Sequence, residues 1–395
     1  MACALAGALA ACVKPPKAPN SPLVDISPAE SGDDGGGELL RELELEVLAS
    51  YDRFVLDPAS AADAIDPVVG LTAIGVGPQE VGASGVQSRW PVIAVDGQEV
   101  EVVSRALELH LSADRTVGWT FDQISLHLQV CGRTATIPLR VAQVYARDSE
   151  RWTLVSEHLA YAQPMGRWLD EATGPVGAPM PGAIERSDDA AAAAAALTSA
   201  FTAEADRQAT WDSAPDALAV WPDPLQLLRG DAVVTGPSLA ASMQATAIGV
   251  EGVRLALGPG RQSAIAATTL VVTVDRAAGP VAVRLRATAV LEPAAGKAWR
   301  VRMAMVSAPI GVPALVARTL GVIATSVTGN KVTATCTPGP GKVAALDAPP
   351  VSRAWARCGP GSIDRSAPGR TPVPTSTQNN PGPTCGRDLR LAPSR

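Results

Sequence analysis

Two kinds of hydrophobic spacing organise the first part of this chain. From Glu38 to Val55, apolar residues recur at steps of three and four, which predicts an amphipathic helix. Beyond Gly97 apolar and polar residues alternate, which is typical of strands with one buried face. Because the connections between these runs are short, neighbouring strands should be antiparallel. The predicted strands are Val100–Leu111, Val117–Phe121, Ile124–Val130, Ile137–Arg147 and Trp152–Tyr161.

The same order of elements returns in the second part of the chain. An Ala-rich helix is predicted from Ala190 to about Ala209, with Asp188 and Asp189 at its N-terminus, where the helix dipole favours acidic residues. A short apolar segment, Ala217–Trp221, follows the helix. The later strands are predicted at Ala245–Leu257, Ser263–Asp275, Val281–Leu291 and Trp299–Ser307.

Short sequence matches relate the two parts. Leu139-Arg140 followed by Val144 corresponds to Leu285-Arg286 followed by Val290, at an offset of 146 residues. Trp152 corresponds to Trp299 at an offset of 147. Together with the shared order of elements, these matches predict an α+β fold built from two tandem copies of one unit.

The N-terminus carries a targeting pattern. An Ala/Leu run ends in Leu9-Ala10-Ala11-Cys12, which resembles a bacterial lipoprotein signal that is cut before Cys12 and leaves this residue lipidated. No Lys or Arg precedes Lys14, although secretory signals usually open with positive charge, so an ordinary Ala-rich N-terminus or a signal cut elsewhere stays an alternative. The lipoprotein interpretation predicts a membrane anchor in the cell envelope, at the outer membrane or its periplasmic face.

Composition shifts divide the rest of the chain. Residues 1–12 are the predicted signal, and 13–37, rich in Pro and Gly, a flexible tether. The domains are predicted at 38–162 and 188–309, with a Pro/Gly-rich linker at 163–187. Residues 310–336 form an extension of uncertain structure. Residues 337–395 are predicted to be a disordered basic, Pro-rich tail, and a frameshifted segment would have the same composition.

Charge and cysteine content exclude several classes of function. The net charge of -6 gives the chain no basic footprint for nucleic acid. Cys131, Cys336, Cys358 and Cys385 contain no CxxC pair, so zinc-knuckle spacing is absent and disulfide pairing among them stays open. No P-loop, nucleophile elbow or GxGxxG follows a predicted strand, so the sequence identifies no cofactor.

One segment of the first part is similar to a known family. The phrase Arg151-Trp-Thr-Leu-Val-Ser-Glu-His158, with Arg140 and Val144-Tyr145 on the preceding strand, resembles the last strands of NTF2-like, or SnoaL-like, domains. The resemblance covers about Glu38–Ala162 and, more faintly, Asp188–Pro309. It implies two cone-shaped domains, each a curved antiparallel sheet covered by N-terminal helices around a pocket. Members of this family include isomerases, hydrolases, polyketide cyclases and non-catalytic binding proteins.

Candidate chemistry in the first domain centres on His158. His158 should share a buried face with Trp152 and Leu154, because side chains two apart in a strand point the same way. Asp122 and Arg140 are weak candidates to assist it as a general base, and core packing is the alternative role. His110 and His127 should point away from the Leu-lined face, which argues against a metal site. The predicted pocket residues are Trp119, Arg140, Trp152 and His158.

Three functions are compatible with these patterns. The first is a non-catalytic envelope lipoprotein that binds a small apolar ligand or an envelope protein. The second is a SnoaL-like enzyme of the isomerase, cyclase or hydrolase type, with one active pocket in the first domain. The third is a structural scaffold whose pockets are filled by side chains. An open pocket with converging polar groups would favour the enzyme, and a filled cone would favour the scaffold.

Overall fold

The chain forms two sheet-based halves. A computed structural model of the protein describes most residues of both halves, which we call the first half (up to residue 162) and the second half (from residue 179 to 310). Among the described residues, no helix is long and apolar enough to cross a membrane. The described residues are 34–56, 73–78, 80–82, 92–94, 100–130, 133–148, 150–162, 164, 166, 169, 177, 179–203, 206–294, 298–310, 324–328 and 331–334.

One long helix and one sheet make up the first half. Helix α1 (Asp34–Leu56) begins four residues before the predicted start, inside the segment expected to be a tether. The strand order is β2-β1-β8-β7-β6-β4, and β5 also pairs with β6. All of these pairings are antiparallel except β1 with β8, which is parallel. The strands are β1 (Ala73–Ile74), β2 (Val81–Gly82), β4 (Val100–Ser104), β5 (Glu108–Leu111), β6 (Val117–Val130), β7 (Arg133–Arg147) and β8 (Trp152–Ala160).

The second half has a sheet of similar order and several shorter helices. Its strand order is β11-β10-β15-β14-β13-β12-β9, with β10 parallel to β15 and β9 parallel to β12. The helices are α3 (Asp188–Thr202), α4 (Arg207–Thr210), α5 (Ala232–Thr235) and α6 (Leu239–Met243). The strands are β9 (Ala183–Ile184), β10 (Leu218–Val220), β11 (Leu227–Arg229), β12 (Ala245–Leu257), β13 (Ala264–Val274), β14 (Val281–Pro293) and β15 (Trp299–Ser307).

A small third sheet joins distant parts of the chain. The hairpin of β16 (Ala324–Thr328) and β17 (Lys331–Ala334) lies beside β3 (Val92–Ala94), and β17 runs parallel to β3. A segment after the second half therefore returns to residues that precede the main strands of the first half.

The two main sheets share one strand path. In the first, a short hairpin (β1, β2) is joined through β1 to the last long strand, β8, and the order continues through β7 and β6. In the second, β10 and β11 form the hairpin, and the order continues through β15, β14 and β13. Ile74 pairs with His158 on β8 just as Val220 pairs with Met305 on β15. The predicted α+β class with two sheet-based domains is confirmed.

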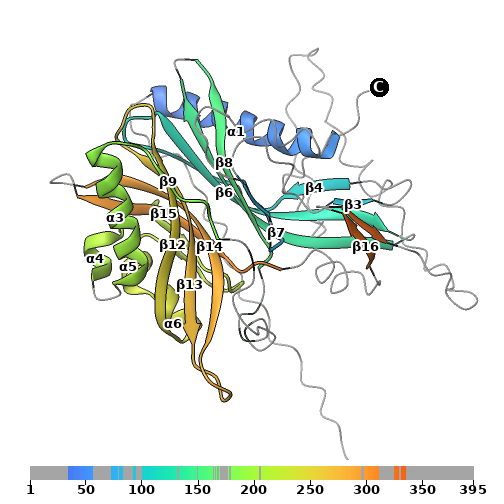
Figure 1. Ribbon diagram of the computed structural model, residues 1–395. Helices are drawn as coiled ribbons and strands as arrows, with labels where there is room; N and C mark the ends of the chain where they lie inside the picture. Colours follow the sequence, from blue (N-terminus) through green and yellow to red (C-terminus); the bar gives the residue numbers. More distant parts are fainter. Residues whose placement is uncertain are drawn as a thin grey trace, which may run out of the picture.

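The halves stack as helix, sheet, sheet and helix. Figure 1 shows α1 across the outer face of the first sheet and α3, α4 and α5 along the outer face of the second. Each outer face has its own apolar core, one around Leu43, Val47 and Leu154, the other around Leu197, Trp211 and Leu285. A third core lies between the sheets, and we call this interface the seam. Its buried apolar residues are Val117, Trp119, Phe121, Ala142, Val144, Ala146, Val155, Ala160, Leu218, Val220, Ile265, Val290, Met303 and Met305.

Several predicted boundaries differ from the observed ones for local reasons. The two strands expected around Asp122 are one strand, β6, because the Asp122 carboxylate accepts hydrogen bonds from Tyr51 and from the backbone of Ala106, so that it fits inside a strand. The single strand expected at Val100–Leu111 is instead divided into β4 and β5 at that same contact. Helix α3 begins with a cap in which the Ser187 hydroxyl accepts from Ala190, and it ends at Thr202, before the predicted end.

Some predicted features lie outside the described residues. These are the signal and its Cys12, part of the linker, the tail 337–395, and Cys131, Cys336, Cys358 and Cys385.

Candidate functional site

His158 lies in the seam, buried against the second half. Its Nδ1 is 3.1 Å from the hydroxyl oxygen of Thr288, and its Nε2 is 2.7 Å from the hydroxyl oxygen of Ser307. Both hydroxyls can donate or accept, so they satisfy a neutral imidazole in either tautomer. Burial, assisted by the positive charge of Arg286, lowers the pKa of His158 to about 3. This histidine is therefore a neutral link between the two sheets.

The predicted orientation of His158 is wrong, and a β-bulge explains why. Tyr145 pairs with Leu154, but the next partner of β8 is Ser156, opposite Val144, so Val155 is an extra residue in the ladder. Each extra residue reverses the alternation of side chains beyond it. Trp152 and Leu154 face α1 as predicted, whereas His158 faces the seam and Glu157 takes the interior direction.

Arg140 also crosses the seam. Its guanidinium donates to the carbonyl oxygens of Trp221 at 2.7 Å and Pro224 at 2.7 Å, both in the second half. A third carbonyl, of Asp223, lies at 3.2 Å. Burial lowers the pKa of Arg140 to about 10, a value that keeps the group charged at neutral pH. This arginine is therefore fully engaged by backbone groups.

Arg286 makes the reciprocal contact from the second half to the first. It donates to the carbonyl oxygen of Gly75 at 3.0 Å and to that of Pro78. Residues 75, 78 and 140 each lie 146 positions before residues 221, 224 and 286, so the two arginines bind equivalent carbonyls of opposite halves. The seam thus has approximate twofold symmetry within one chain.

The interior of the first half is closed by side chains and a polar network. Tyr51 of α1 donates to Asp122 at 3.1 Å, and burial raises the pKa of this carboxyl group. Nearby, the Gln143 amide donates to Ser50 at 3.0 Å and to Glu157 at 2.9 Å, and it accepts from Tyr145 at 3.0 Å. Each of these groups has a partner, so the network stabilises α1 against the sheet.

Asp122 does not meet the other two catalytic candidates. It contacts Tyr51 and the backbone of Ala106 on the α1 side of the sheet, whereas His158 and Arg140 contact the second half. A general base and a carboxylate must lie within hydrogen-bond reach of each other or of a shared substrate atom. A continuous sheet separates these groups, so the arrangement provides no acid–base pair made from His158 and Asp122.

Trp119 and His110 occupy another part of the seam. They pair across β5 and β6 and stack with ring centroids 5.8 Å apart. Burial lowers the pKa of His110, in spite of the opposing charge of Asp216. His110 points away from the Leu-lined face as predicted, and it is partly buried against Trp119. Among the residues that the structure describes, no group of three or more His, Cys, Asp or Glu could hold a metal ion.

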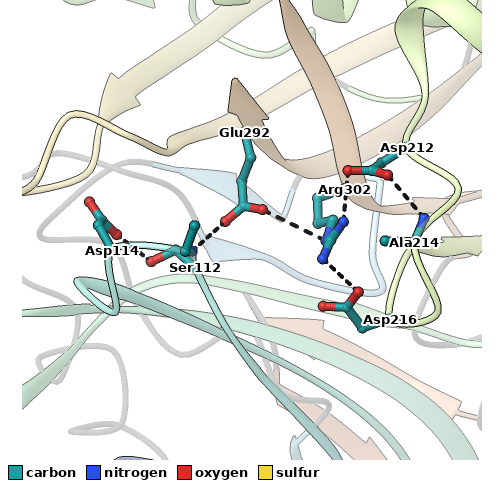
Figure 2. Close-up of polar contacts among 8 residues, drawn as sticks. Ser112, Asp114, Asp212, Ala214, Asp216, Glu292 and Arg302 are labelled. Atoms are coloured by element: carbon teal, nitrogen blue, oxygen red, sulfur yellow. Dashed lines mark hydrogen bonds and ion pairs between the residues drawn. The ribbon is translucent and has the colours of Figure 1, made fainter. Parts of the chain in front are cut away.

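A charged cluster closes one edge of the seam. Figure 2 shows Arg302 of β15 between Asp212, Asp216 and Glu292. Its guanidinium lies 2.7 Å from Asp212 and 2.6 Å from Asp216, and these carboxylates outweigh its burial and raise its pKa. Glu292 in turn accepts from the backbone nitrogen of Ala113, in the first half, at 3.1 Å. The cluster therefore links the loop between β5 and β6 to the second sheet.

The second half contains a small space that opens toward the surface. Phe201, Trp211 and Trp221 form successive edge-to-face contacts, with ring centroids 5.7 and 5.6 Å apart. A cavity of about 20 Å³ lies beside them and shares Arg207 and Ser238 with an open depression of about 550 Å³. The enclosed part is large enough for one water molecule. The Arg207 guanidinium donates to the carbonyl oxygens of Gly236 and Val233.

The most important residues of the seam were missing from the sequence-based site. Thr288, Ser307 and Arg286 were not predicted to contact the first half. The match between Leu139-Arg140 and Leu285-Arg286 was a usable signal, because a buried arginine repeated in both copies predicts a repeated role. Thr288 and Ser307 carry no such signal, since their equivalents in the first half are alanines.

Comparison with known proteins gives matches only among solved structures. Neither known families nor curated proteins gave a match. The solved structures include an NTF2-like superfamily protein from Salmonella enterica, 12% identical with a TM-score of 0.25, covering 30% of this chain and 87% of its own. A putative ketosteroid isomerase from Shewanella frigidimarina is 12% identical with a TM-score of 0.25, covering 30% and 98%. Aln2 from Streptomyces is 12% identical with a TM-score of 0.24, covering 31% and 89%. At these values the matches carry no argument about activity, ligand or partner.

Proposed function

We propose that this protein is a non-catalytic lipoprotein of the cell envelope that serves as a scaffold for an envelope protein partner. In this proposal its two halves are duplicated NTF2-like units that form a dimer within one chain. The observation that carries the scaffold is the reciprocal contact of Arg140 and Arg286 across the seam, and the envelope location rests on the sequence pattern at Cys12. Groups that an enzyme would need for substrate binding instead hold the halves together.

Two features of the first half support a scaffold over an enzyme. Leu43, Val47 and Tyr51 of α1 are at most 2% exposed and fill the space above the sheet. The catalytic candidates His158 and Asp122 contact opposite sides of that sheet. Because a substrate would have to displace α1 and break its polar network, catalysis in this half is the weaker hypothesis.

The membrane anchor is tested by changing Cys12. Cys12→Ser should abolish lipidation, so the protein should move from the membrane fraction to a soluble or unprocessed form. Cys3→Ser is the matched control, since Cys3 would be removed with the signal. Metabolic labelling with a radioactive fatty acid, together with the mass of the mature protein, gives the readout. Membrane partitioning that is unchanged in Cys12→Ser would reject the anchor.

A second candidate function is the binding of a small apolar ligand by the second half. It is supported by the depression at Arg207 and Ser238, which adjoins the small cavity lined by Phe201, Trp211 and Trp221. Ala241 lines this depression with an exposed side chain, so Ala241→Trp should fill it without entering the core. Ala195→Trp, on the exposed side of α3, is the matched control.

The fluorescent probe 8-anilinonaphthalene-1-sulfonate distinguishes the two candidates. Saturable binding that Ala241→Trp removes and Ala195→Trp retains would support a ligand site in the second half. No saturable binding in the unmodified protein would support the scaffold alone. Saturable binding that survives Ala241→Trp would exclude the depression as the site.

A further inference from the structure

At three equivalent positions of the seam, one half has a polar side chain and the other half has an apolar one. In the ladder between β7 and β8, Ala142 pairs with His158 and Arg140 with Ala160. In the ladder between β14 and β15, Thr288 pairs with Met305 and Arg286 with Ser307. With the arginines as reference points, His158 is the equivalent of Met305, Ala142 of Thr288, and Ala160 of Ser307.

These six residues form two complementary sets. His158 of the first half binds the two hydroxyls of the second half, Thr288 and Ser307. Met305 of the second half belongs to the same apolar cluster as Ala142 and Ala160 of the first. All six are at most 5% exposed, so water cannot substitute for a missing partner.

Other pairings of the same surfaces would lose this match. Two first halves would place each His158 against Ala142 and Ala160, and both ring nitrogens would be buried without a partner. Two second halves would place each Met305 against Thr288 and Ser307, and their hydroxyls would lose the imidazole. Burial of an unpartnered polar group is unfavourable.

The two arginines cannot discriminate between these pairings. Each binds backbone carbonyls, and the carbonyls of Gly75 and Pro78 in the first half are equivalent to those of Trp221 and Pro224 in the second. In any pairing of halves, an arginine therefore meets the same two acceptors. Strength and specificity of the seam reside in different residues.

We propose that two complementary sets of residues make each sheet face specific for the face of the other half. One is the polar set His158, Thr288 and Ser307, and the other is the apolar set Met305, Ala142 and Ala160. Each face therefore disfavours pairing with a second copy of the same face. Specificity of this kind rests on penalties in the wrong complexes as well as on contacts in the right one. The first-half face is thus a surface for a second half, whether from the same chain or from an exchanged one. The proposal is independent of the ligand or partner of the whole protein.

The test removes the difference between the faces in the full-length chain. His158→Met, Thr288→Ala and Ser307→Ala together give both faces the Met-Ala-Ala set. We expect this triple variant to fold, but to form several-fold more dimers and larger species than the unmodified protein. In these species, first halves pair with first halves and second with second. Refolding over a range of protein concentrations, followed by size-exclusion chromatography with light scattering, measures the distribution.

A reversed variant provides the control. Exchanging the two sets with His158→Met, Met305→His, Ala142→Thr, Ala160→Ser, Thr288→Ala and Ser307→Ala restores complementarity with opposite polarity. It should refold to the same species as the unmodified protein. A triple variant that refolds without additional oligomers would overturn the proposal, and so would a reversed variant that folds and oligomerises as much as the triple.

Discussion

The two halves of the molecule share a strand path and differ in how their polar groups are used. The first half buries a network around Gln143 and Asp122 beneath α1, and it directs His158 into the seam. The second half fills its interior with Trp211 and Trp221, and it directs Thr288 and Ser307 into the seam. The comparison teaches that topology and the reciprocal arginines have been kept in both halves, whereas the chemistry at equivalent positions has diverged.

The largest effect on stability is expected at His158, whose equivalent in the second half is Met305. The pKa of His158 is about 3 in the folded protein and about 6.5 when unfolded, so the folded state resists protonation. The contribution of neutral His158 to the free energy of unfolding is fully present above pH 6.5. It is lost as the pH drops toward 3, by up to about 4 kcal/mol. His158→Gln should flatten this acid dependence, as measured by urea unfolding between pH 7 and pH 4. Parallel pH profiles of the two proteins would show that His158 does not control the seam.

The shared arginines predict the next effect. Arg286→Met leaves the buried carbonyl of Gly75 and the partly buried carbonyl of Pro78 without their arginine donor, and an unpartnered buried group costs about 1–3 kcal/mol. We expect a loss of about 2–4 kcal/mol of unfolding free energy, and a similar loss for Arg140→Met. If one of the two substitutions were tolerated and the other were disruptive, Arg140 and Arg286 would not have equivalent roles in the two halves.

A smaller effect on stability is expected at Gly252, a glycine of the second half that takes no part in the reciprocal arginine contacts. Gly252 lies at a bulge of β12 with a φ of +63°, and a Cβ there would be 1.9 Å from the carbonyl oxygen of Met180. Gly252→Ala should therefore destabilise the protein by about 1–3 kcal/mol. Gly249→Ala in the same strand is the control, since the nearest atom to its Cβ would be at 3.9 Å. Equal melting temperatures of these two variants would show that the close approach of Met180 is not needed.

The amino-acid pattern was sufficient for the long strands and insufficient for the seam. Alternation placed β12 and β15 at their observed bounds, because each of these strands lies between clear turn signals. It failed at His158, because the consecutive apolar residues Leu154 and Val155 are equally compatible with a regular buried strand, so the sequence does not identify Val155 as an extra residue. The parallel pairing of β1 with β8 joins residues more than 80 positions apart, and no local signal specifies such a pair.

Only part of the candidate site could be predicted from the sequence, because its contacts join residues that are far apart along the chain. Arg140 was singled out as a possible partner of His158, whereas its repetition as Arg286 is the sequence signal that points to its observed role. Its acceptors are backbone carbonyls, which no side-chain pattern encodes. His158 was recognised as buried, but its partners lie 130 and 149 residues away, so only the tertiary structure identifies them.

The smallest effect is expected at the exposed rim of the seam. Arg229 of β11 lies 3.1 Å from Glu108 of β5, so this ion pair joins the two halves as the buried arginines do. Its side chain is 46% exposed, however, and water and salt weaken the attraction. Arg229→Gln should therefore cost less than about 1 kcal/mol, and 1 M salt should remove the difference from the unmodified protein. A loss as large as that of Arg286→Met, at any salt concentration, would mean that the rim holds the halves together as strongly as the buried seam.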